Sequence, residues 1–473
     1  MTDVRDLVGL LQRADWTRLS LSAEVNDGST VLVLPGKRYR YQTAERLTGC
    51  DGGRPWEMYE EDDYRGGSVH WISGPEAPLA HLLCPAWLLE CSRLELRGRT
   101  RVCGREALDV VMTRRPSLRR GPVSGDGTHG PVEVVVDAES GILLRVADPD
   151  VEPEVTELVR ADFAPVIEAA RFQPPPGSLI AEGFGESFVS ALGPVARVGS
   201  TAAGLAAGAL GAWIRYSPRR RAEPAPPDGV DIESSIAADE PPPDRSPDGP
   251  LVSEELLDLL YAGGPTGFAA TLHHWMDLGA MAASVPASAR RVGLGGLGLL
   301  MDAVNAQPTA AHKVSAVRFA GPGRYQIDHA YDAGRLPTTI ACDGQRTWLI
   351  YSDKITTGPA EPPPGYIGDL ADPSWLLRCT LSGGATVTVG NRPAYRITAT
   401  RRDGSGAALI LFPTAIALVD AELGIISRLT SYIGDRPVQR YELRDITTAT
   451  GDFHPRIPPG LPVSEKPNQH RSR

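Results

Sequence analysis

Histidine and cysteine side chains gather in one stretch of the N-terminal half, and these are the side chains that hold zinc in proteins. The stretch contains His70, His81, Cys84, Cys91 and Cys103. Structural zinc sites space their ligands in short pairs such as C-x-x-C, and no such pair occurs here. We therefore interpret the thiols as small buried side chains and predict no metal site.

Two further patterns could carry chemistry. GLGGLG at 293–298 matches the G-x-G-x-x-G of dinucleotide sites, but neither the strand that should precede it nor the acid that should follow about twenty residues later is present. His273 and His274 are adjacent, and we interpret them as surface residues on two faces of a helix. With no Walker A or G-x-S-x-G motif either, we predict no cofactor and no catalytic residues. An enzyme stays open as a third alternative.

Large aromatic side chains recur at matching places in the two halves of the chain. Trp56 has a counterpart in Trp348, and Trp87 has one in Trp375. Such residues most simply fill a core, and the alternative is that some of them line an apolar cavity. For that alternative, the candidate ligand-contacting residues are Trp56, Tyr59, Trp87, Trp348, Tyr351 and Trp375.

The tryptophan pairs belong to an internal repeat. PVEVVVDAESGILLR at 131–145 returns as TAIALVDAELGIISR at 414–428. Several other matches keep the same order, which predicts two copies of one domain. They are PGKRYR (35–40) with PGRYQI (322–327), CDGGRPWEMY (50–59) with CDGQRTWLIY (342–351), PAWLLEC (85–91) with PSWLLRC (373–379), and VCGREALDV (102–110) with VGNRPAYRI (389–397).

Within one copy the local patterns favour strands over helices. The β-branched run at 29–34 ends at Pro35-Gly36, and the 131–145 phrase has the pattern of a strand, a tight turn at Asp137 to Gly141, and a second strand. A proline precedes each WLL segment, which suits a short helix or turn. Each copy is therefore predicted to be an antiparallel meander with few helices.

The order of these motifs resembles the LolA-like lipoprotein-carrier superfamily, which includes sigma-factor regulators of the RseB type. The resemblance covers both copies. It implies an α+β fold with two curved antiparallel half-barrel sheets, each wrapped around an apolar cavity with a helical lid.

The composition of the chain predicts how the copies are arranged. A small-residue helix and a disordered linker, rich in proline and acids, join them. We predict a first copy at 1–180, the apolar helix at 181–216, the linker at 217–250, a helical preface with helix continuing through Trp275 at 251–304, a second copy at 305–463 and a disordered tail at 464–473.

The joining segment raises the question of a membrane. Val198–Ile214 carries no charge, and Gly204 and Gly208 form a G-x-x-x-G pair that is typical of close helix packing. Its glycine and alanine content and the absence of a secretory signal favour docking on protein over a bilayer. We expect a cytoplasmic protein, with membrane association through this segment as the alternative.

The bulk composition narrows the function classes. The net charge of −10 disfavours general nucleic-acid binding. The leading hypothesis is a non-enzymatic binding protein that holds an apolar, lipid-like ligand or a partner segment in its half-barrels. The alternative is a regulatory or scaffold protein that binds other proteins through its sheet surfaces and has filled cores. An open site with convergent polar groups would favour a ligand, and a filled core would favour the scaffold.

Overall fold

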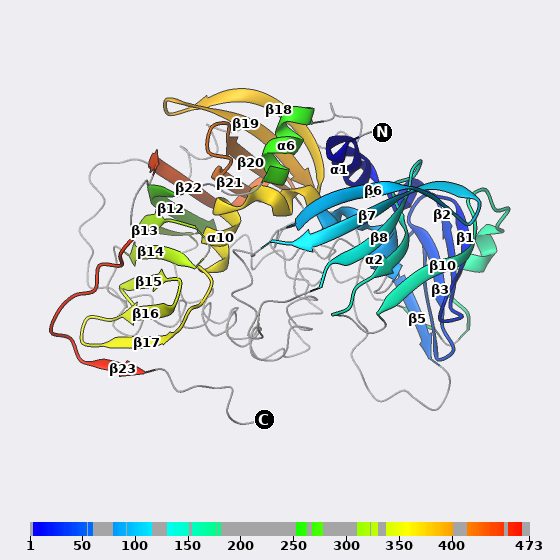
Figure 1. The fold of residues 1–473 in the computed structure, drawn as a ribbon, viewed down its shortest axis with the longest axis horizontal. Helices are drawn as coiled ribbons and strands as arrows, with labels where there is room; N and C mark the ends of the chain where they lie inside the picture. The colour runs from blue at the N-terminus through cyan, green and yellow to red at the C-terminus, as the bar shows by residue number, and fades with distance from the viewer. Residues whose placement is uncertain are drawn as a thin grey trace.

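Two antiparallel sheets, one from each half of the chain, make up most of the computed structural model (Figure 1). Each sheet is open, because its first and last strands do not pair with each other. The α+β prediction with two half-barrel-like sheets is confirmed. The structure describes residues 3–53, 55–59, 79–90, 92–115, 130–150, 154–176, 178–180, 252–262, 267–277, 310–321, 323–329, 337–400, 414–448 and 453–465.

The first sheet has the strand order β11-β5-β4-β3-β2-β1-β10-β9-β8-β7-β6. Its inner face packs on α1, α2 and η2, and η3 lies on its outer face. The elements are α1 (Val4–Arg13), η1 (Trp16–Arg18), β1 (Leu21–Val25), β2 (Thr30–Leu34), β3 (Arg38–Gln42), β4 (Arg46–Asp51), β5 (Pro55–Tyr59), α2 (Leu79–Leu83), η2 (Pro85–Leu89), β6 (Ser92–Val102), β7 (Arg105–Arg114), β8 (Val132–Asp137), β9 (Leu143–Ala147), β10 (Val155–Asp162), η3 (Ala169–Phe172) and β11 (Leu179–Ile180).

The second sheet has the order β18-β19-β20-β21-β22-β12-β13-β14-β15-β16-β17-β23, with only its last pair parallel. Its elements are α6 (Glu254–Ala262), β12 (Phe268–Asp277), β13 (Ala310–Phe319), β14 (Arg324–His329), β15 (Thr339–Asp343), β16 (Arg346–Ile350), β17 (Ile355–Pro359), α10 (Gly365–Ala371), η4 (Pro373–Arg378), β18 (Thr380–Val389), β19 (Arg392–Thr400), β20 (Thr414–Asp420), β21 (Ile426–Ile433), β22 (Arg436–Thr448) and β23 (Val463–Glu465).

The strand registers align the two copies residue by residue. Tyr39 faces Cys50 across β3 and β4, and Tyr325 faces Cys342 across β14 and β15. In the same alignment, β12 is the second copy's equivalent of β1, and α6 is its equivalent of α1. The predicted helix through Trp275 is therefore wrong, because that residue lies on strand β12, which pairs with β13 and β22 at the centre of the second sheet. Segment 251–304 thus supplies the second copy's opening helix and first strand.

The repeated hairpin phrase has a physical reason in each copy. Asp137 is fully buried and accepts hydrogen bonds from Arg105, with Nε–Oδ1 at 2.7 Å, and from Ser140. Asp420 and Arg392 make the same pair, with Nε–Oδ2 at 2.5 Å. In each copy the carboxylate fixes the turn after its own strand and anchors that turn to the adjacent strand that carries the arginine, β7 or β19.

The glycine of each hairpin is required because the turn approaches a helix. Gly141 has φ 76°, and a Cβ there would lie 2.8 Å from the carbonyl oxygen of Leu10 in α1. Gly424 has φ 64°, and its Cβ would lie 3.2 Å from the side chain of Leu259 in α6. Each hairpin thus packs on the opening helix of its own copy.

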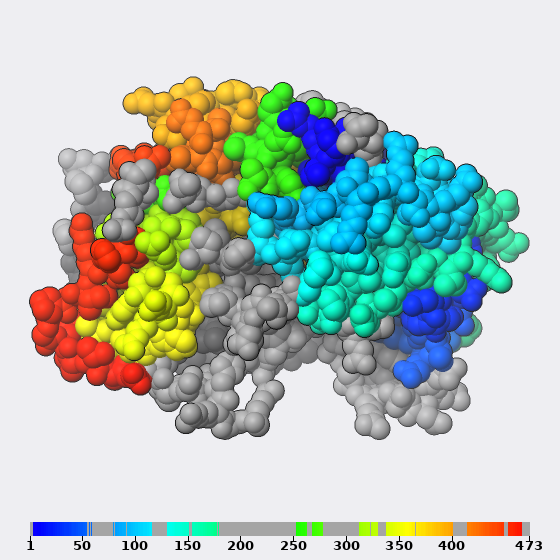
Figure 2. All heavy atoms as spheres, viewed as in Figure 1, coloured from blue at the N-terminus to red at the C-terminus, as the bar shows by residue number. Residues whose placement is uncertain are grey.

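Short helices from both copies meet and join the two sheets. α1 packs against α6 and η2 against η4, and Figure 2 shows α1 and α6 touching at the top of the molecule. Glu90 and Arg378 form an ion pair at 2.5 Å that is only 16% and 15% exposed. The Arg115 guanidinium donates to the carbonyl oxygens of Tyr261 and Ala262. One hydrophobic core runs through both copies at this junction.

Several predicted segments lie outside the described residues. They are the whole of 181–216 with Val198–Ile214, the linker at 217–250, the GLGGLG at 293–298, and the tail from 466. No helix in the described ranges is long and apolar enough to cross a bilayer. The five described cysteines form no disulfide.

Candidate functional site

The structure places the predicted aromatic residues at separate locations. Trp56 on β5 is buried and donates from its indole nitrogen to the carbonyl oxygen of Phe172 at 2.9 Å. It lies on the outer face of the first sheet, because it shares the face of Gly49 and Arg40. Trp348 shares the face of Ala341 and Gln326, so it occupies the corresponding outer face of the second sheet.

The other predicted aromatics lie at the junction and at a strand end. Trp87 and Trp375 sit in η2 and η4, and each indole donates to a carbonyl oxygen six residues earlier, at 3.0 Å. Tyr351 follows β16, with the Lys354 ammonium 5.3 Å from its ring centre. Tyr59 ends β5, and its side chain lies outside the described atoms. The five residues whose side chains the structure describes are not brought together in one cavity, and ligand contact by any of the six stays a prediction.

The histidines and cysteines of the first half are dispersed in the part that the structure describes. The rings of His81 and Trp87 have centres 5.3 Å apart and are tilted by 44°, whereas the Cys103 thiol, in the turn between β6 and β7, donates to the carbonyl oxygen of Leu158. No group of three or more His, Cys, Asp or Glu that could hold a metal occurs among the described residues.

Polar side chains that were not predicted as a site gather on the inner face of the second sheet. They come from the part of β12 and β13 that extends beyond the length of their counterparts in the first copy, and from neighbouring strands. Because paired residues share a face, His274 lies beside Lys313 and Tyr441, and Ser315 lies beside His329. We call His274, Lys313, Ser315, His329, Gln439 and Tyr441 the inner-face cluster.

Hydrogen bonds and ring stacking connect the members of the inner-face cluster. The Gln439 amide nitrogen lies 2.7 Å from the Tyr441 hydroxyl and 3.2 Å from Nε2 of His274. The His274 ring stacks on Tyr441 with centres 4.2 Å apart, and Tyr366 of α10 stacks on Tyr441 at 5.8 Å.

A second bonded pair lies on the neighbouring strands. The Ser315 hydroxyl and Nδ1 of His329 are 2.9 Å apart. The three hydroxyl and amide groups of the cluster are thus positioned by the strand register and by contacts to their neighbours.

Burial sets the charge of the inner-face cluster. It lowers the pKa of His274 to about 3 and that of His329 to about 4, so both rings are neutral at pH 7. Burial also lowers the pKa of Lys313 to about 7, and its positive charge acts to lower the pKa of both histidines. The Tyr441 pKa is raised by burial and by Tyr366. The cluster can therefore offer one titratable cation together with neutral hydrogen-bonding groups.

The inner face is buried along most of its length, and part of the inner-face cluster keeps some exposure. Phe268 and Leu272 are almost fully buried, whereas His274, Lys313 and His329 further along are partly exposed. The pattern HH at 273–274 was the one sequence signal for this place, and the surface-helix interpretation was wrong. On a strand, adjacent residues point to opposite faces, so His274 enters the inner face while His273 meets His312 on the outer face at 3.2 Å.

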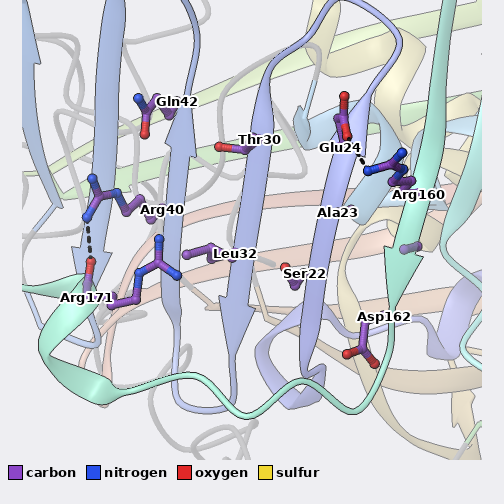
Figure 3. Close-up of a pocket in the computed structure, with 11 residues that line it drawn as sticks. Ser22, Ala23, Glu24, Thr30, Leu32, Arg40, Gln42, Arg160, Asp162 and Arg171 are labelled. Atoms are coloured by element: carbon purple, nitrogen blue, oxygen red, sulfur yellow. Dashed lines mark hydrogen bonds and ion pairs between the residues drawn. The ribbon is translucent and has the colours of Figure 1, made fainter.

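A second candidate place is a groove of about 490 Å³ on the outer face of the first sheet (Figure 3). Its floor comes from alternate residues of adjacent strands, with Leu32 near its centre. Figure 3 shows the Arg171 side chain reaching from η3 toward Leu32, beside Arg40. The lining residues are Ser22, Ala23, Glu24, Thr30, Leu32, Arg40, Gln42, Arg160, Ala161, Asp162 and Arg171.

Comparison with solved structures finds similar folds at low identity. A crystal structure of MucB is 19% identical over 40% of this chain and 70% of that chain, with a TM-score of 0.24. A complex of Pseudomonas aeruginosa MucA/MucB is 17% identical over 37% and 62%, with a TM-score of 0.24. A LolA superfamily protein from Nitrosomonas europaea is 9% identical over 43% and 96%, with a TM-score of 0.20.

These matches include the superfamily that the sequence motifs resemble. Each covers about the length of one copy. With TM-scores this low they establish no ligand, partner or activity for this chain. No protein-family model matches the chain. No curated protein matches it either.

Proposed function

We propose that this chain is a non-enzymatic binding protein that holds an amphipathic, lipid-like ligand on the inner face of the second sheet. The observation that carries the proposal is the inner-face cluster, in which a titratable lysine and several neutral hydrogen-bonding groups converge beside the packed core, with His274, Lys313 and His329 partly exposed. The first copy has the same fold and carries Ser29 where the second has Ser315, but its shorter β1–β2 hairpin has no strand positions for His274 and Lys313, so the fold does not require these two groups. Polar groups placed on an apolar face without a structural need are typical of functional sites.

The surroundings of the cluster suit a ligand with one apolar and one polar part. Leu272 and Met276 lie on the same strand face as His274 and offer apolar contact. Lys313 would attract an anionic head group, and Ser315 and Gln439 can exchange hydrogen bonds with it. Binding sites of this kind combine an apolar wall with a few converging polar groups.

The alternative is a regulatory or scaffold protein that binds a partner protein through its sheet surfaces. The filled inner face of the first sheet favours it, since Leu21, Val25, Val31 and Val33 are almost fully buried there. In that case the inner-face cluster would bind no small amphipathic molecule, and the ligand experiment below distinguishes the two functions.

The place of action is part of the proposal. We propose that the protein works in the cytoplasm, with Val198–Ile214 docked on protein. Fractionation of the full-length chain beside a variant without residues 198–214 tests this. Sedimentation with membranes that resists salt and disappears in the deletion variant would favour membrane association instead.

The experiment for the ligand compares two of the four lysines of the chain. Lys313 belongs to the inner-face cluster, and Lys354 does not. The purified full-length protein is analysed by native mass spectrometry for co-purified lipid and is then titrated with palmitate. We expect Lys313→Met to lose bound lipid and to weaken palmitate binding about tenfold or more, because a charged hydrogen bond is removed. The matched control Lys354→Met should bind as the wild type does. No bound lipid and no palmitate binding in the wild type would reject the proposal.

A further inference from the structure

The outer faces of the two sheets carry different side chains at the place where the first sheet has its groove. The register that aligns Tyr39 with Tyr325 also aligns Leu32 with Arg318, Arg40 with Gln326, and Gln42 with Asp328. This correspondence allows the groove of the first sheet to be compared directly with the same place in the second.

In the second copy these side chains satisfy one another. Arg318 donates to the Gln326 side-chain oxygen, and the Gln326 amide nitrogen donates to Asp328 at 2.8 Å. The Thr339 hydroxyl donates to Asp328 at 2.8 Å, and the backbone N–H of Arg456 donates to Gln326 at 2.9 Å. This polar network occupies the outer face at the position that is a groove in the first copy.

In the first copy the corresponding groups leave cationic hydrogen-bonding capacity unused. Arg40 donates to the carbonyl oxygen of Arg171 at 3.1 Å, and neither guanidinium has an acidic partner among the described residues. The Gln42 side chain, in the described part, makes no hydrogen bond. Both acids of the groove are already engaged elsewhere, since Glu24 faces Arg160 at 3.9 Å and Asp162 accepts from the N–H of Ala164.

We infer that the groove binds an anionic group, a phosphate or a carboxylate, between Arg40 and Arg171. Two like charges side by side on a partly buried wall repel each other, and an anion between them relieves that repulsion while it accepts hydrogen bonds from both guanidinium groups. Gln42 adds an amide donor at the rim, and Leu32 offers apolar contact to whatever carries the anion.

The fold holds this pair in place through an aromatic anchor. The indole of Trp56 fixes the backbone of Phe172, and Phe172 is fully buried, so the neighbouring Arg171 is held at the groove. The groove lies on the outer face of the first sheet, whereas the inner-face cluster lies on the inner face of the second. The inference about the groove is therefore independent of the proposed function.

The test is isothermal titration of the full-length protein at low ionic strength with inorganic phosphate and, separately, with acetate. Arg40→Gln introduces the residue that the second sheet has at this position. This variant and Arg171→Gln should each lower the affinity for the bound anion by about tenfold or more. The matched control Arg160→Gln removes the same charge from the other side of the groove and should weaken binding less than about threefold, because exposed charges contribute little.

Each outcome decides the inference. Tighter binding of phosphate assigns the site to a phosphate group, and tighter binding of acetate assigns it to a carboxylate. An equal loss in all three variants would mean general charge attraction, and the absence of heat with either anion would mean no site; both results overturn the inference. Thermal unfolding of the exposed Arg171→Gln variant, expected to match the wild type, shows that lost binding is not lost folding.

Discussion

The hairpin β1–β2 of the first copy and the hairpin β12–β13 of the second begin alike and end differently. In the first copy, β1 ends at Val25 and a tight turn follows, closed by hydrogen bonds from the N–H of Val25 to the carbonyl oxygen of Ser29 and from the N–H of Gly28 to the carbonyl oxygen of Val25. In the second, the strands continue to Asp277 and Ala310, and each has ten residues where its counterpart has five.

The difference shows where a duplicated fold can acquire a site. The shared part of each hairpin carries apolar residues on the inner face, because it forms the core. The added part extends past that core, so its inner-face positions are free to hold His274, Lys313 and Ser315. The outer faces differ in the opposite sense, since the first copy has the groove and the second has the polar network.

The largest effect should come from the feature that the copies share. Asp137→Asn and Asp420→Asn each leave a partly buried arginine without its main anion, and each should lower the free energy of unfolding by about 3 kcal/mol. Chemical denaturation measures this, with Glu139→Gln and Glu422→Gln as exposed controls that should change it by less than about 0.5 kcal/mol. A large loss in one copy and none in the other would contradict the equivalence of the hairpins.

The same aspartates predict a pH dependence. Burial alone would raise the pKa of Asp137, but hydrogen bonds from Arg105 and Ser140 outweigh it and hold the pKa below its usual value. Asp420 behaves in the same way with Arg392. Stability from these groups is therefore present above the unfolded pKa of about 4 and is lost as pH falls below it. Denaturation from pH 6 to pH 3 should show a decline that both Asn variants reduce.

Glycine substitutions should sharpen the comparison of the hairpins. Gly141→Ala puts a methyl group against helix backbone at a positive φ and should cost about 2–3 kcal/mol. Gly424→Ala meets the end of a flexible leucine side chain and should cost about 1–2 kcal/mol for the backbone conformation alone. If thermal melts showed a larger loss of stability for Gly424→Ala than for Gly141→Ala, the two different contacts would not explain the glycines.

Lys313 should distinguish the extended hairpin from an ordinary core. Burial favours its neutral form, so the charged form destabilises the ligand-free fold below the folded pKa of about 7. Lys313→Met should therefore raise stability by about 1–3 kcal/mol at pH 6, and this gain should shrink as pH rises from 7 toward the unfolded pKa of about 10. Denaturation of ligand-free protein at pH 6, 8 and 10 measures it. A gain that does not depend on pH would contradict the burial of an ammonium group.

The smallest expected effect concerns the anchor beside the groove. Trp56→Phe removes the hydrogen bond to Phe172 and should cost about 1 kcal/mol, because one buried acceptor loses its donor. Trp348→Phe, in the corresponding position, should cost less than about 0.5 kcal/mol. If both variants lost the same stability, the anchor would not be particular to the first copy.

The sequence predicted the features that are local and repeated. The Asp–Gly turn, the WLL segments and the two sheets follow from short motifs whose residues are neighbours in the chain. β12 was missed because it shares no sequence motif with β1. It is also twice as long as β1, so the two strands do not align as a repeat. The inner-face cluster joins residues of β12, β13, β14 and β22, and the groove depends on which outer-face residue replaces which. Both require the strand register, which single motifs do not give.

The proposed ligand occupies the extended inner face of the second copy. Hydrogen–deuterium exchange of the full-length protein with and without palmitate tests it most directly. We predict slower exchange in segments 272–277, 312–316 and 437–443, and unchanged exchange in segment 21–34 of the first copy. Protection of segment 21–34, or no protection in any of these segments when palmitate is saturating, would contradict the claim.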